Sequence, residues 1–298
     1  MAALTKLRVG IVGGFQIGKS TLVNCLLDGK FARTGGMGVA VTAIPTRYVY
    51  GQLQGAQLMQ SGRPVAAMSV QDFLSLGTIP GQVDEIVITA WRPALQNIEL
   101  VDTPGFKATD KDTQTTEAAI KALDFVIVLL NNKSLDTKEA GILNFIFRLG
   151  KPFMVIVNCV NQGGVLWDPA ADANKKIIAE IESRINNIGS RPVSIASQSV
   201  WSCNLLWYWY ASGNYLSDAK EQRDDTVSKM AFFIQNFLRT AKDNHIMVAE
   251  KSNVPGLLNL FEGGQPWGFP LNFMRWNATV SASLNDWHAS LNTLTSNL

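Results

Sequence analysis

The octapeptide Gly13-Gly14-Phe15-Gln16-Ile17-Gly18-Lys19-Ser20 is the most informative stretch of this 298-residue chain. It matches the pattern G-x-x-x-x-G-K-[ST], in which consecutive backbone N–H groups surround a phosphate group. The pattern indicates phosphate binding only where it lies between a strand and a helix. Both flanks fit, because the apolar run 7–12 precedes it and the apolar positions of 21–27 recur at helical spacing. The sequence therefore predicts a strand, a glycine-rich loop and a helix that bind the phosphates of a nucleotide.

Each residue type in the octapeptide has a physical role in phosphate binding. Gly13 and Gly18 permit backbone conformations that residues with a Cβ rarely adopt, so that N–H groups can turn toward a phosphate. The following helix directs its unpaired N–H groups and positive dipole end at the same anion. We expect the Lys19 ammonium at the β and γ phosphates and the Ser20 hydroxyl at Mg²⁺. The residues expected to bind the nucleotide here are Gly13, Gly14, Phe15, Gln16, Ile17, Gly18, Lys19, Ser20 and Thr21.

The amino-acid composition narrows the class of protein to which this chain can belong. Hydrophobic residues make up 47% of the chain, which is enough for a substantial core, and 26 basic against 24 acidic residues leave a net charge of +2. This balance does not indicate a nucleic-acid partner. The three cysteines, of which Cys25 is expected in the core, fit a reducing compartment and have no metal-ligand spacing. Without a signal peptide or a long apolar run, the protein is expected to be cytoplasmic, with at most peripheral membrane contact.

Strands and helices are expected to alternate along the chain. The unbroken apolar run 125–130 indicates a strand buried on both faces, as in a parallel sheet. Strict succession of strand and helix around a phosphate loop predicts an α/β fold with a doubly wound, mostly parallel sheet. The pattern predicts a hairpin at 56–68, a short helix at 69–76, strands at 85–91, 97–101, 152–157 and 192–195, and helices at 113–123, 137–149 and 172–188.

A second motif lies at the end of an expected strand. Asp102-Thr103-Pro104-Gly105 follows the strand 97–101. The Asp102 carboxylate can hold Mg²⁺ through water, and the Gly105 N–H can contact a γ-phosphate and register its loss. After a phosphate loop in the same chain, this motif indicates a nucleotide switch.

A threonine is expected to complete the magnesium site. Thr42 lies between the first helix and the second strand, next to a glycine-rich segment, where a hydroxyl group can coordinate the metal when a γ-phosphate is present. Thr46 is the competing candidate, but 44–48 has the pattern of a strand, so Thr42 is preferred. The expected metal ligands are Ser20, Thr42 and Asp102.

Three segments together resemble one protein family. VGGFQIGKSTLVNCLL (12–27), VTAIPTRYVYG (41–51) and VDTPGF (101–106), in this order, resemble the GTPase domain of the dynamin superfamily, especially its bacterial branch. The resemblance covers roughly residues 6–200 and implies a P-loop GTPase fold. It further implies weak binding of GTP and GDP with Mg²⁺, no separate exchange factor, and faster hydrolysis when two such domains pair as a homodimer.

The resemblance also suggests catalytic residues. Thr42 is the threonine expected to orient the attacking water, with help from Gln16 and Lys19. Dynamin itself has a Gln-Ser pair where this chain has Phe15 and Gln16, so Gln16 is the polar participant expected here. Phe106 offers no water-orienting amide, and catalysis is therefore expected to depend on the metal and a partner protomer as well.

Recognition of the base is expected at two further loops. The segment 158–161 resembles the guanine-binding pattern N/T-K-x-D, with Asn158 first and Asn161 in place of the aspartate. Asn161 would face one guanine donor with a donor of its own, which costs on the order of 1 to 3 kcal/mol. The segment 194–197 resembles the last base-contacting loop through Ala196 and Ser197. The sequence thus leaves open whether guanine or another purine is preferred.

The remaining sequence is expected to form helices. We predict a GTPase domain at 1–263 that contains an aromatic-rich helical insertion at 200–253, and a C-terminal amphipathic helix at 264–298. The insertion or the C-terminal helix could dock a protein partner. Two other functions stay open: a nucleotide-binding adaptor with little hydrolysis, and a purine nucleotide hydrolase of relaxed base specificity.

Overall fold

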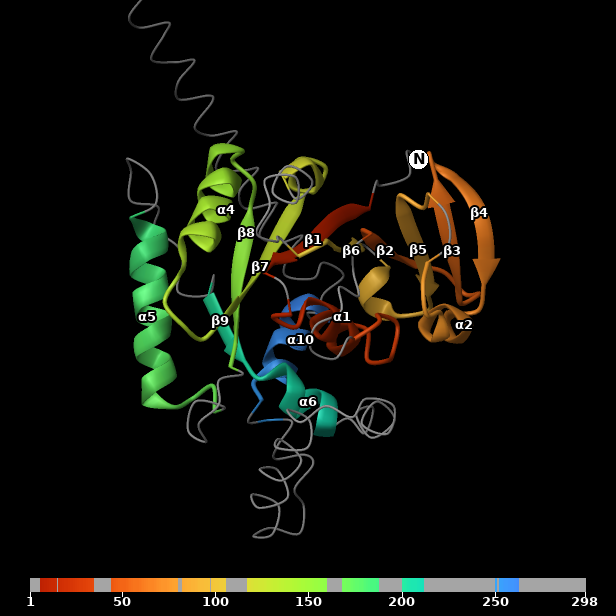
Figure 1. The fold of residues 1–298 in the computed structure, drawn as a ribbon. Coiled ribbons are helices and arrows are strands. Elements are labelled where there is room, and N and C mark those ends of the chain that lie inside the picture. Colours follow the sequence, from red (N-terminus) through yellow and green to blue (C-terminus); the bar gives the residue numbers. More distant parts are fainter. Residues whose placement is uncertain are drawn as a thin grey trace, which may run out of the picture.

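The computed structural model places one nine-stranded sheet at the centre of the molecule, with helices on both faces (Figure 1). The structure describes residues 6–14, 16–34, 44–79, 82–96, 98–105, 117–159, 168–187, 200–211, 250 and 252–262. The strand order is β4-β3-β5-β2-β6-β1-β7-β8-β9. The expected α/β fold with a doubly wound, mostly parallel sheet is confirmed, because five of the eight strand pairings are parallel.

Five neighbouring parallel strands make one half of the sheet. The most buried of them is β7, whose continuous apolar run is covered on both faces, as its sequence predicts. Because all five run in the same direction, their carboxyl ends meet at one edge, and ligands of such sheets bind there. In spatial order these strands are β6 (Ile98–Asp102), β1 (Leu7–Gly13), β7 (Phe125–Asn131), β8 (Phe153–Asn158) and β9 (Val200–Cys203).

Four strands extend the sheet beyond β6. The first, β2, runs antiparallel to β6 and parallel to β5. The hairpin of β3 and β4 completes this half, and its two-residue turn has positive φ angles at Ser61 (51°) and Gly62 (76°), which confirms the predicted hairpin. The bounds are β2 (Thr46–Tyr50), β3 (Gly55–Gln60), β4 (Arg63–Met68) and β5 (Glu85–Ala90).

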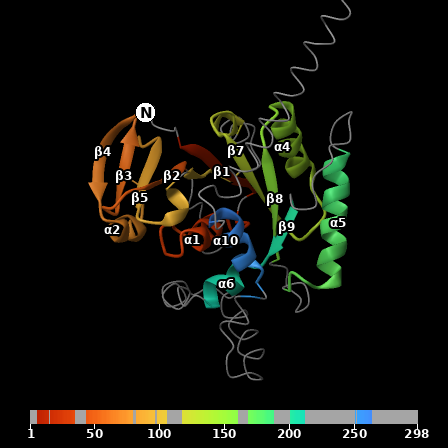
Figure 2. The same ribbon diagram turned by 180° about the vertical axis from the view of Figure 1, so that it is seen from behind.

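Helices cover the sheet on two sides and enclose two hydrophobic cores. One face packs against α1 (Lys19–Leu26), α2 (Val70–Ser75), the 3₁₀ turn η1 (Pro93–Leu95), α6 (Leu205–Ala211) and α10 (Val254–Glu262). The other face packs against a helical turn at 117–121, α4 (Thr137–Arg148) and α5 (Asp172–Asn186). Figure 2, seen from behind, shows α10 beside α1. No helix in the described parts of the chain is long and apolar enough to span a bilayer.

The caps of α4 show why this helix begins and ends where it does. The Asp136 carboxylate accepts from the N–H groups of Lys138 and Glu139, and the Glu139 carboxylate accepts from the N–H of Asp136. At the other end Gly150 has a φ of 60°, a left-handed conformation that suits glycine and ends the helix. The predicted helix 137–149 is thereby confirmed.

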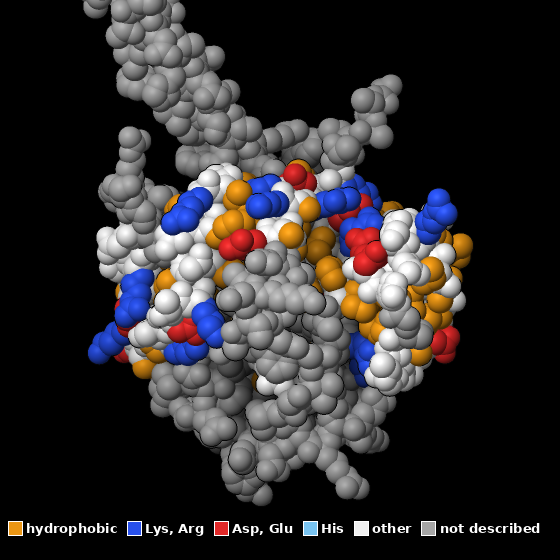
Figure 3. Space-filling model, turned by 45° about the horizontal axis from the view of Figure 1, so that its top comes forward, with side chains coloured by type: hydrophobic (Ala, Val, Ile, Leu, Met, Phe, Trp, Pro, Cys, Tyr) orange, Lys and Arg blue, Asp and Glu red, His pale blue; other side chains and the backbone are white. Residues whose placement is uncertain are grey.

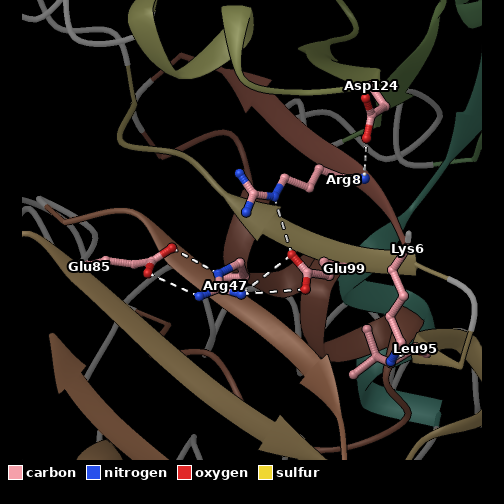
Figure 4. Close-up of polar contacts among 7 residues, drawn as sticks. All are labelled: Lys6, Arg8, Arg47, Glu85, Leu95, Glu99 and Asp124. Carbon is pink, nitrogen blue, oxygen red and sulfur yellow. Dashed lines mark hydrogen bonds and ion pairs between the residues drawn. The ribbon is translucent and has the colours of Figure 1, made fainter. Parts of the chain in front are cut away.

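An ion-pair network ties the two halves of the sheet together (Figure 4). The Arg47 guanidinium of β2 contacts the Glu85 carboxylate of β5 at 2.9 Å and the Glu99 carboxylate of β6 at 3.4 Å. Arg8 of β1 reaches the same Glu99 at 3.3 Å, and its N–H donates to Asp124. The Arg47–Glu99 contact crosses the antiparallel junction of β2 and β6, where the sheet changes direction.

The strand β9, at the β8 edge of the sheet, was not predicted. The predicted strand 192–195 lies outside the described residues, and the strand that pairs with β8 is β9. Residues 200–203 had been assigned to the insertion, so the boundary of the insertion at 200 is corrected. The helix α6 then packs against α1, which places 200–211 in the central domain. Residues 212–249 and the expected helix 264–298 lie outside the described residues.

Candidate functional site

The glycine-rich loop leaves the sheet at Gly13, the last residue of β1. A Cβ at Gly13 would lie 2.5 Å from the Leu129 carbonyl oxygen. Gly18 has a φ of 99°, and a Cβ there would lie 2.9 Å from Asn158 Nδ2. The two glycines are therefore required by close backbone packing at Gly13 and by a left-handed conformation at Gly18. Gln16 also has a positive φ, 57°, so that the loop turns sharply before α1.

Lys19 is held across this loop. Its Nζ donates to the carbonyl oxygens of Gly14 at 2.8 Å and Gly13 at 3.1 Å. The side chain is buried, and burial lowers the pKa of its ammonium group, although the negative charge of Asp102 acts in the opposite direction. Among the described residues this buried ammonium group bonds only to uncharged carbonyls, so it is well placed to gain from the oxygens of a phosphate. Thr21 follows in the first turn of α1.

Ser20 and Asp102 meet at the carboxyl edge of the sheet. The Ser20 hydroxyl donates to Asp102 Oδ2 over 2.8 Å. Burial raises the pKa of the Asp102 carboxyl group to about 6, while the nearby Lys19 charge and the Ser20 hydrogen bond act to lower it. Asp102 Oδ1 is also buried, and it has no hydrogen-bond partner among the residues that the structure describes. A buried acceptor without a partner is the kind of group that a cation would satisfy.

These oxygens fit Mg²⁺. In the described parts of the chain no group of three His, Cys, Asp or Glu side chains could hold a metal ion. Mg²⁺ at nucleotide sites keeps several waters and is bound through one or two carboxylates together with phosphate oxygens, so it needs no cluster of three such side chains. The hydroxyl of Ser20 and the carboxylate of Asp102 are such hard ligands, and their pairing provides that part of a magnesium site.

Thr103 fixes the segment that follows Asp102, a role that the sequence did not reveal. Its Oγ1 donates to the Ile11 carbonyl over 2.8 Å, and its N–H donates to the same oxygen over 3.3 Å. The side chain is fully buried. The start of the Asp102–Gly105 motif is thus fastened to β1, two residues before the glycine-rich loop begins at Gly13.

Several predicted site residues lie outside the described part of the chain: Phe15, Thr42, Asn161, Ala196 and Ser197. Their roles stay predictions. Thr46, the alternative to Thr42, is the first residue of β2, where it is buried and paired with Asp102 in the antiparallel register. The expectation that Thr46 belongs to a strand is confirmed.

Asn158 links the phosphate loop to a segment that sequence reasoning missed. Its Nδ2 donates to the Ile17 carbonyl over 3.0 Å, and its Oδ1 accepts from the Leu205 N–H over 3.2 Å. Cys203 pairs with Asn158 in the parallel register, so the segment 203–205 begins at the carboxyl edge of the sheet. The β-favouring residues Val200 and Trp201, followed within three residues by the polar Asn204, are the sequence signal that could have identified this strand end.

The three cysteines lie beside this segment. Cys25, Cys159 and Cys203 are all buried, which confirms the expectation that Cys25 belongs to the core. The Cys159 N–H donates to the Cys203 carbonyl over 2.8 Å. Burial raises the pKa of the Cys159 thiol to about 12 and the pKa values of the other two well above their usual range. These thiols therefore act as packing groups rather than nucleophiles.

Known proteins match the chain over its central domain. A family model described as 50S ribosome-binding GTPase matches residues 8–159, slightly more than half of the sequence. Dynamin-like protein 2 of Campylobacter jejuni subsp. jejuni serotype O:23/36 (strain 81-176) is 29% identical over 159 residues, which cover 50% of this chain and 25% of that protein.

Two solved structures share the fold. Both are described as an oligomerised bacterial dynamin pair that provides a mechanism for the long-range sensing and tethering of membranes. Their TM-scores are 0.51 and 0.50, their identities 19% and 22%, and they cover 86% and 79% of this chain. The chain covers 37% of each of these proteins, so it spans well under half the length of its relatives.

The matched region contains most of the geometry described above. It runs from β1 through the phosphate loop and Asp102 to Cys159, just past the end of β8. The sequence and fold matches also confirm the resemblance to dynamin-like GTPases. Since the family model covers more than half of the sequence and the fold agrees with it, the chain belongs to this family of GTPases.

Proposed function

We propose that this protein is a dynamin-like GTPase that binds and hydrolyses GTP with Mg²⁺ at the carboxyl edge of its sheet. One observation carries the proposal: the Ser20 hydroxyl and the buried Asp102 carboxylate are joined over 2.8 Å. Next to them, Lys19 is anchored on the glycine-rich loop. A phosphate-binding loop, an ammonium group and a pair of hard oxygen ligands at one strand edge are the parts that phosphoryl transfer requires.

The residues of this chain divide the chemistry among them. The N–H groups of the loop and of the first turn of α1 bind the phosphates, and the Lys19 ammonium neutralises their oxygens. Ser20, Asp102 and Thr42 would hold Mg²⁺, which when bound would further neutralise the charge on the β and γ phosphates. Thr42 and Gln16 orient the attacking water, and Gly105 donates to the γ-phosphate and moves when that group is lost.

The base is read from the neighbouring loops. Asn158 holds the phosphate loop and the segment 203–205 in a fixed relation through its two hydrogen bonds. We place the base between Asn161 and this segment, because the carboxyl ends of β8 and β9 lie side by side. Segment 203–205 lies beside the base in this proposal, but the N–H groups of Asn204 and Leu205 already donate to Ser252 and Asn158, so Ala196 and Ser197 keep the role that the sequence predicts for them. Guanine is the proposed base. Asn161, which stands where the guanine-binding pattern has an aspartate, weakens the preference for guanine over other purines.

A second copy of the chain is the proposed partner. The solved bacterial dynamins that share the fold are described as an oligomerised pair, which supports association of this chain with another copy; pairing of the two GTPase domains is the proposed way to raise turnover. The same description names membranes, so peripheral membrane contact of a cytoplasmic protein is included in the proposal. Figure 3 shows basic and acidic side chains interspersed over the described part of one face, and the net charge is only +2. Neither favours ribosomal RNA or another nucleic acid as partner.

The test is phosphate release from GTP by the purified full chain in Mg²⁺, measured over a range of protein concentrations, with ATP in parallel. Release that is specific for GTP and rises per molecule with protein concentration is the expected result. GTP binding without phosphate release would support an adaptor in its place. Equal turnover of ATP would support a purine nucleotide hydrolase without base selection.

A further inference from the structure

Hydrogen bonds join the end of β9 to the start of α10, and the proposed chemistry leaves them without a role. Asn253 Nδ2 donates to the Ser202 carbonyl over 2.7 Å, and the Trp201 indole N–H donates to the Asn253 carbonyl over 3.0 Å. The Asn204 N–H donates to the Ser252 carbonyl over 2.8 Å. We call these five residues, Trp201, Ser202, Asn204, Ser252 and Asn253, the β9–α10 latch.

The β9–α10 latch depends on particular residue types at several of its positions. Asn253 has a φ of 59°, a left-handed conformation that asparagine adopts more readily than most residues. Ser252 is fully buried, and its hydroxyl accepts from the Val254 N–H over 3.2 Å at the start of α10. A Cβ at Gly256 would lie 2.8 Å from the Trp201 ring, so the indole packs directly on the α10 backbone. Each of these features fixes where α10 starts relative to β9.

The latch continues directly into the nucleotide site. Asn204 belongs to the latch, and the next residue, Leu205, donates its N–H to Asn158 Oδ1. Asn158 in turn donates to the Ile17 carbonyl of the phosphate loop. The segment 203–205 is thus held on one side from the phosphate loop and on the other side from α10. The position of this segment beside the proposed base therefore depends on both attachments.

We propose that Asn253 is a positioning residue for base recognition. By holding the Ser202 carbonyl, it sets the place at which segment 203–205 meets the base of a nucleotide bound on the phosphate loop. This inference rests on the proposed nucleotide function and adds to it a residue that acts through Ser202 rather than on the nucleotide. Because coupling between sites is reciprocal, base binding must also order the start of α10.

The experiment compares a nucleotide with its phosphate chain alone. GDP and inorganic tripolyphosphate are titrated in Mg²⁺ into the full-length chain and the Asn253→Gly variant, with binding measured by calorimetry. Glycine retains the left-handed backbone while removing the side-chain donor. The expected result is GDP binding about fivefold to tenfold weaker, as the loss of one hydrogen bond implies, with tripolyphosphate binding within about twofold of wild type.

Two further variants separate positioning from stability. Trp201→Phe removes the indole N–H and keeps a ring against Gly256, so GDP binding should weaken in the same selective way. Ser69→Ala is the matched control, because it removes a hydrogen bond of similar worth, from the Asp72 N–H, at the distant start of α2. It should lower stability and leave the affinities for both ligands unchanged.

Hydrogen exchange provides the reciprocal readout. In the wild type, GDP should slow exchange at the amides of Asn204 and Val254, and in Asn253→Gly the protection at Val254 should be lost. Equal weakening of GDP and tripolyphosphate, unchanged GDP binding, or the same loss in Ser69→Ala would each overturn the inference. A wild type that binds neither ligand would instead overturn the proposed nucleotide function, and this inference with it.

Discussion

The Ser20 hydroxyl donates to the carboxylate of Asp102 across 82 residues of sequence, over 2.8 Å. Parallel pairing of β1 with β6 produces this contact, because it brings the residue after the glycine-rich loop beside the end of β6. The contact leaves Asp102 Oδ1 buried without a partner in the described structure. The site is therefore held in a geometry that is costly until a cation arrives.

The Asp102→Asn variant should be more stable than the wild type when nucleotide and metal are absent. Burial raises the pKa of this carboxyl group from 3.8 to about 6, so its charged form is disfavoured in the folded state. The wild type therefore loses stability as the pH rises through this range, and the amide does not. A pKa shift of about two units lowers the free energy of unfolding of the wild type by up to about 3 kcal/mol above pH 6.5.

Urea unfolding of both proteins in EDTA at pH 4, 5, 6 and 7.5 measures this difference. The difference in the free energy of unfolding between the two proteins should be smallest at pH 4 and largest at pH 7.5. Asp172→Asn, which changes a side chain that is 89% exposed, should show a much smaller dependence on pH. A gap of constant size across the four pH values would contradict the assignment. The same Asp102→Asn variant should lose Mg²⁺-dependent nucleotide binding.

Lys19→Met should lose nucleotide affinity and keep its fold. The Lys19 ammonium is buried against two carbonyl oxygens, and burial lowers its pKa, so the charge is unfavourable in the free protein. Methionine retains the unbranched apolar stem. Loss of the charged hydrogen bonds to phosphate should weaken GDP binding by about 30-fold or more. Calorimetry gives the affinity, and thermal unfolding should show an equal or higher melting temperature. Unaltered GDP affinity would sink the phosphate-loop assignment.

Gly18→Ala should both destabilise the protein and weaken nucleotide binding. A residue with a Cβ pays about 1 to 2 kcal/mol for the left-handed conformation at φ 99°. The new methyl group would also lie 2.9 Å from Asn158 Nδ2 and would displace the hydrogen bond to Ile17. The matched control is Gly62→Ala, where φ is 76° and nothing lies within 4 Å of the added Cβ.

Urea unfolding and GDP titration of both alanine variants separate the two effects. Gly62→Ala should show the conformational cost alone, with wild-type GDP affinity. Gly18→Ala should lose more stability and should bind GDP less tightly. If the two variants behave alike in both measurements, the close contact between Gly18 and Asn158 has no energetic consequence.

Arg47→Met should cost about 1 to 3 kcal/mol of stability, because it leaves two partly buried carboxylates without their shared cation. The Arg47 side chain is 22% exposed between Glu85 and Glu99. Arg8→Met is the control, since the Arg8 side chain is 50% exposed and its only ion pair with a described residue is the one with Glu99, and it should cost no more than about 1 kcal/mol. Urea unfolding at low and high salt measures the loss of stability in both variants. A larger loss in Arg8→Met than in Arg47→Met would show that Arg47 is not the centre of the network.

Local pattern was enough to predict the phosphate loop, the Asp102 motif and the alternation of strands and helices. Their signals are short in sequence: two glycines and a lysine at fixed spacing, a carboxylate after a strand, and a continuous apolar run for β7. The strand and helix that flank residues 13–20, the strand that ends at Asp102 and the buried strand β7 were confirmed, because local geometry determines them, whereas the binding of phosphate and metal stays a prediction. The strand that pairs with β8 was not predicted, because only its pairing with β8 identifies the short segment 200–203 as a strand.

Features that depend on contacts between distant segments could not be predicted. The bridge from Asn158 to Ile17 and Leu205 joins three segments that lie far apart in the chain. The raised pKa of Asp102 requires its burial, which the neighbouring strands and α1 create together. The antiparallel pairing of β2 with β6 could not be predicted from the hydrophobic pattern either, since a strand shows the same alternation whichever way it runs.

The burial of Cys25, Cys159 and Cys203 gives this protein a practical advantage for spectroscopy. Maleimide and methanethiosulfonate reagents attack exposed thiolates, and none of the three native thiols offers one in the folded state. A single cysteine introduced in the exposed turn at Ser61 could therefore carry a fluorophore or spin label while the native residues stay in place. Distances between labels on two copies would then report directly on whether the chains pair when GTP is added.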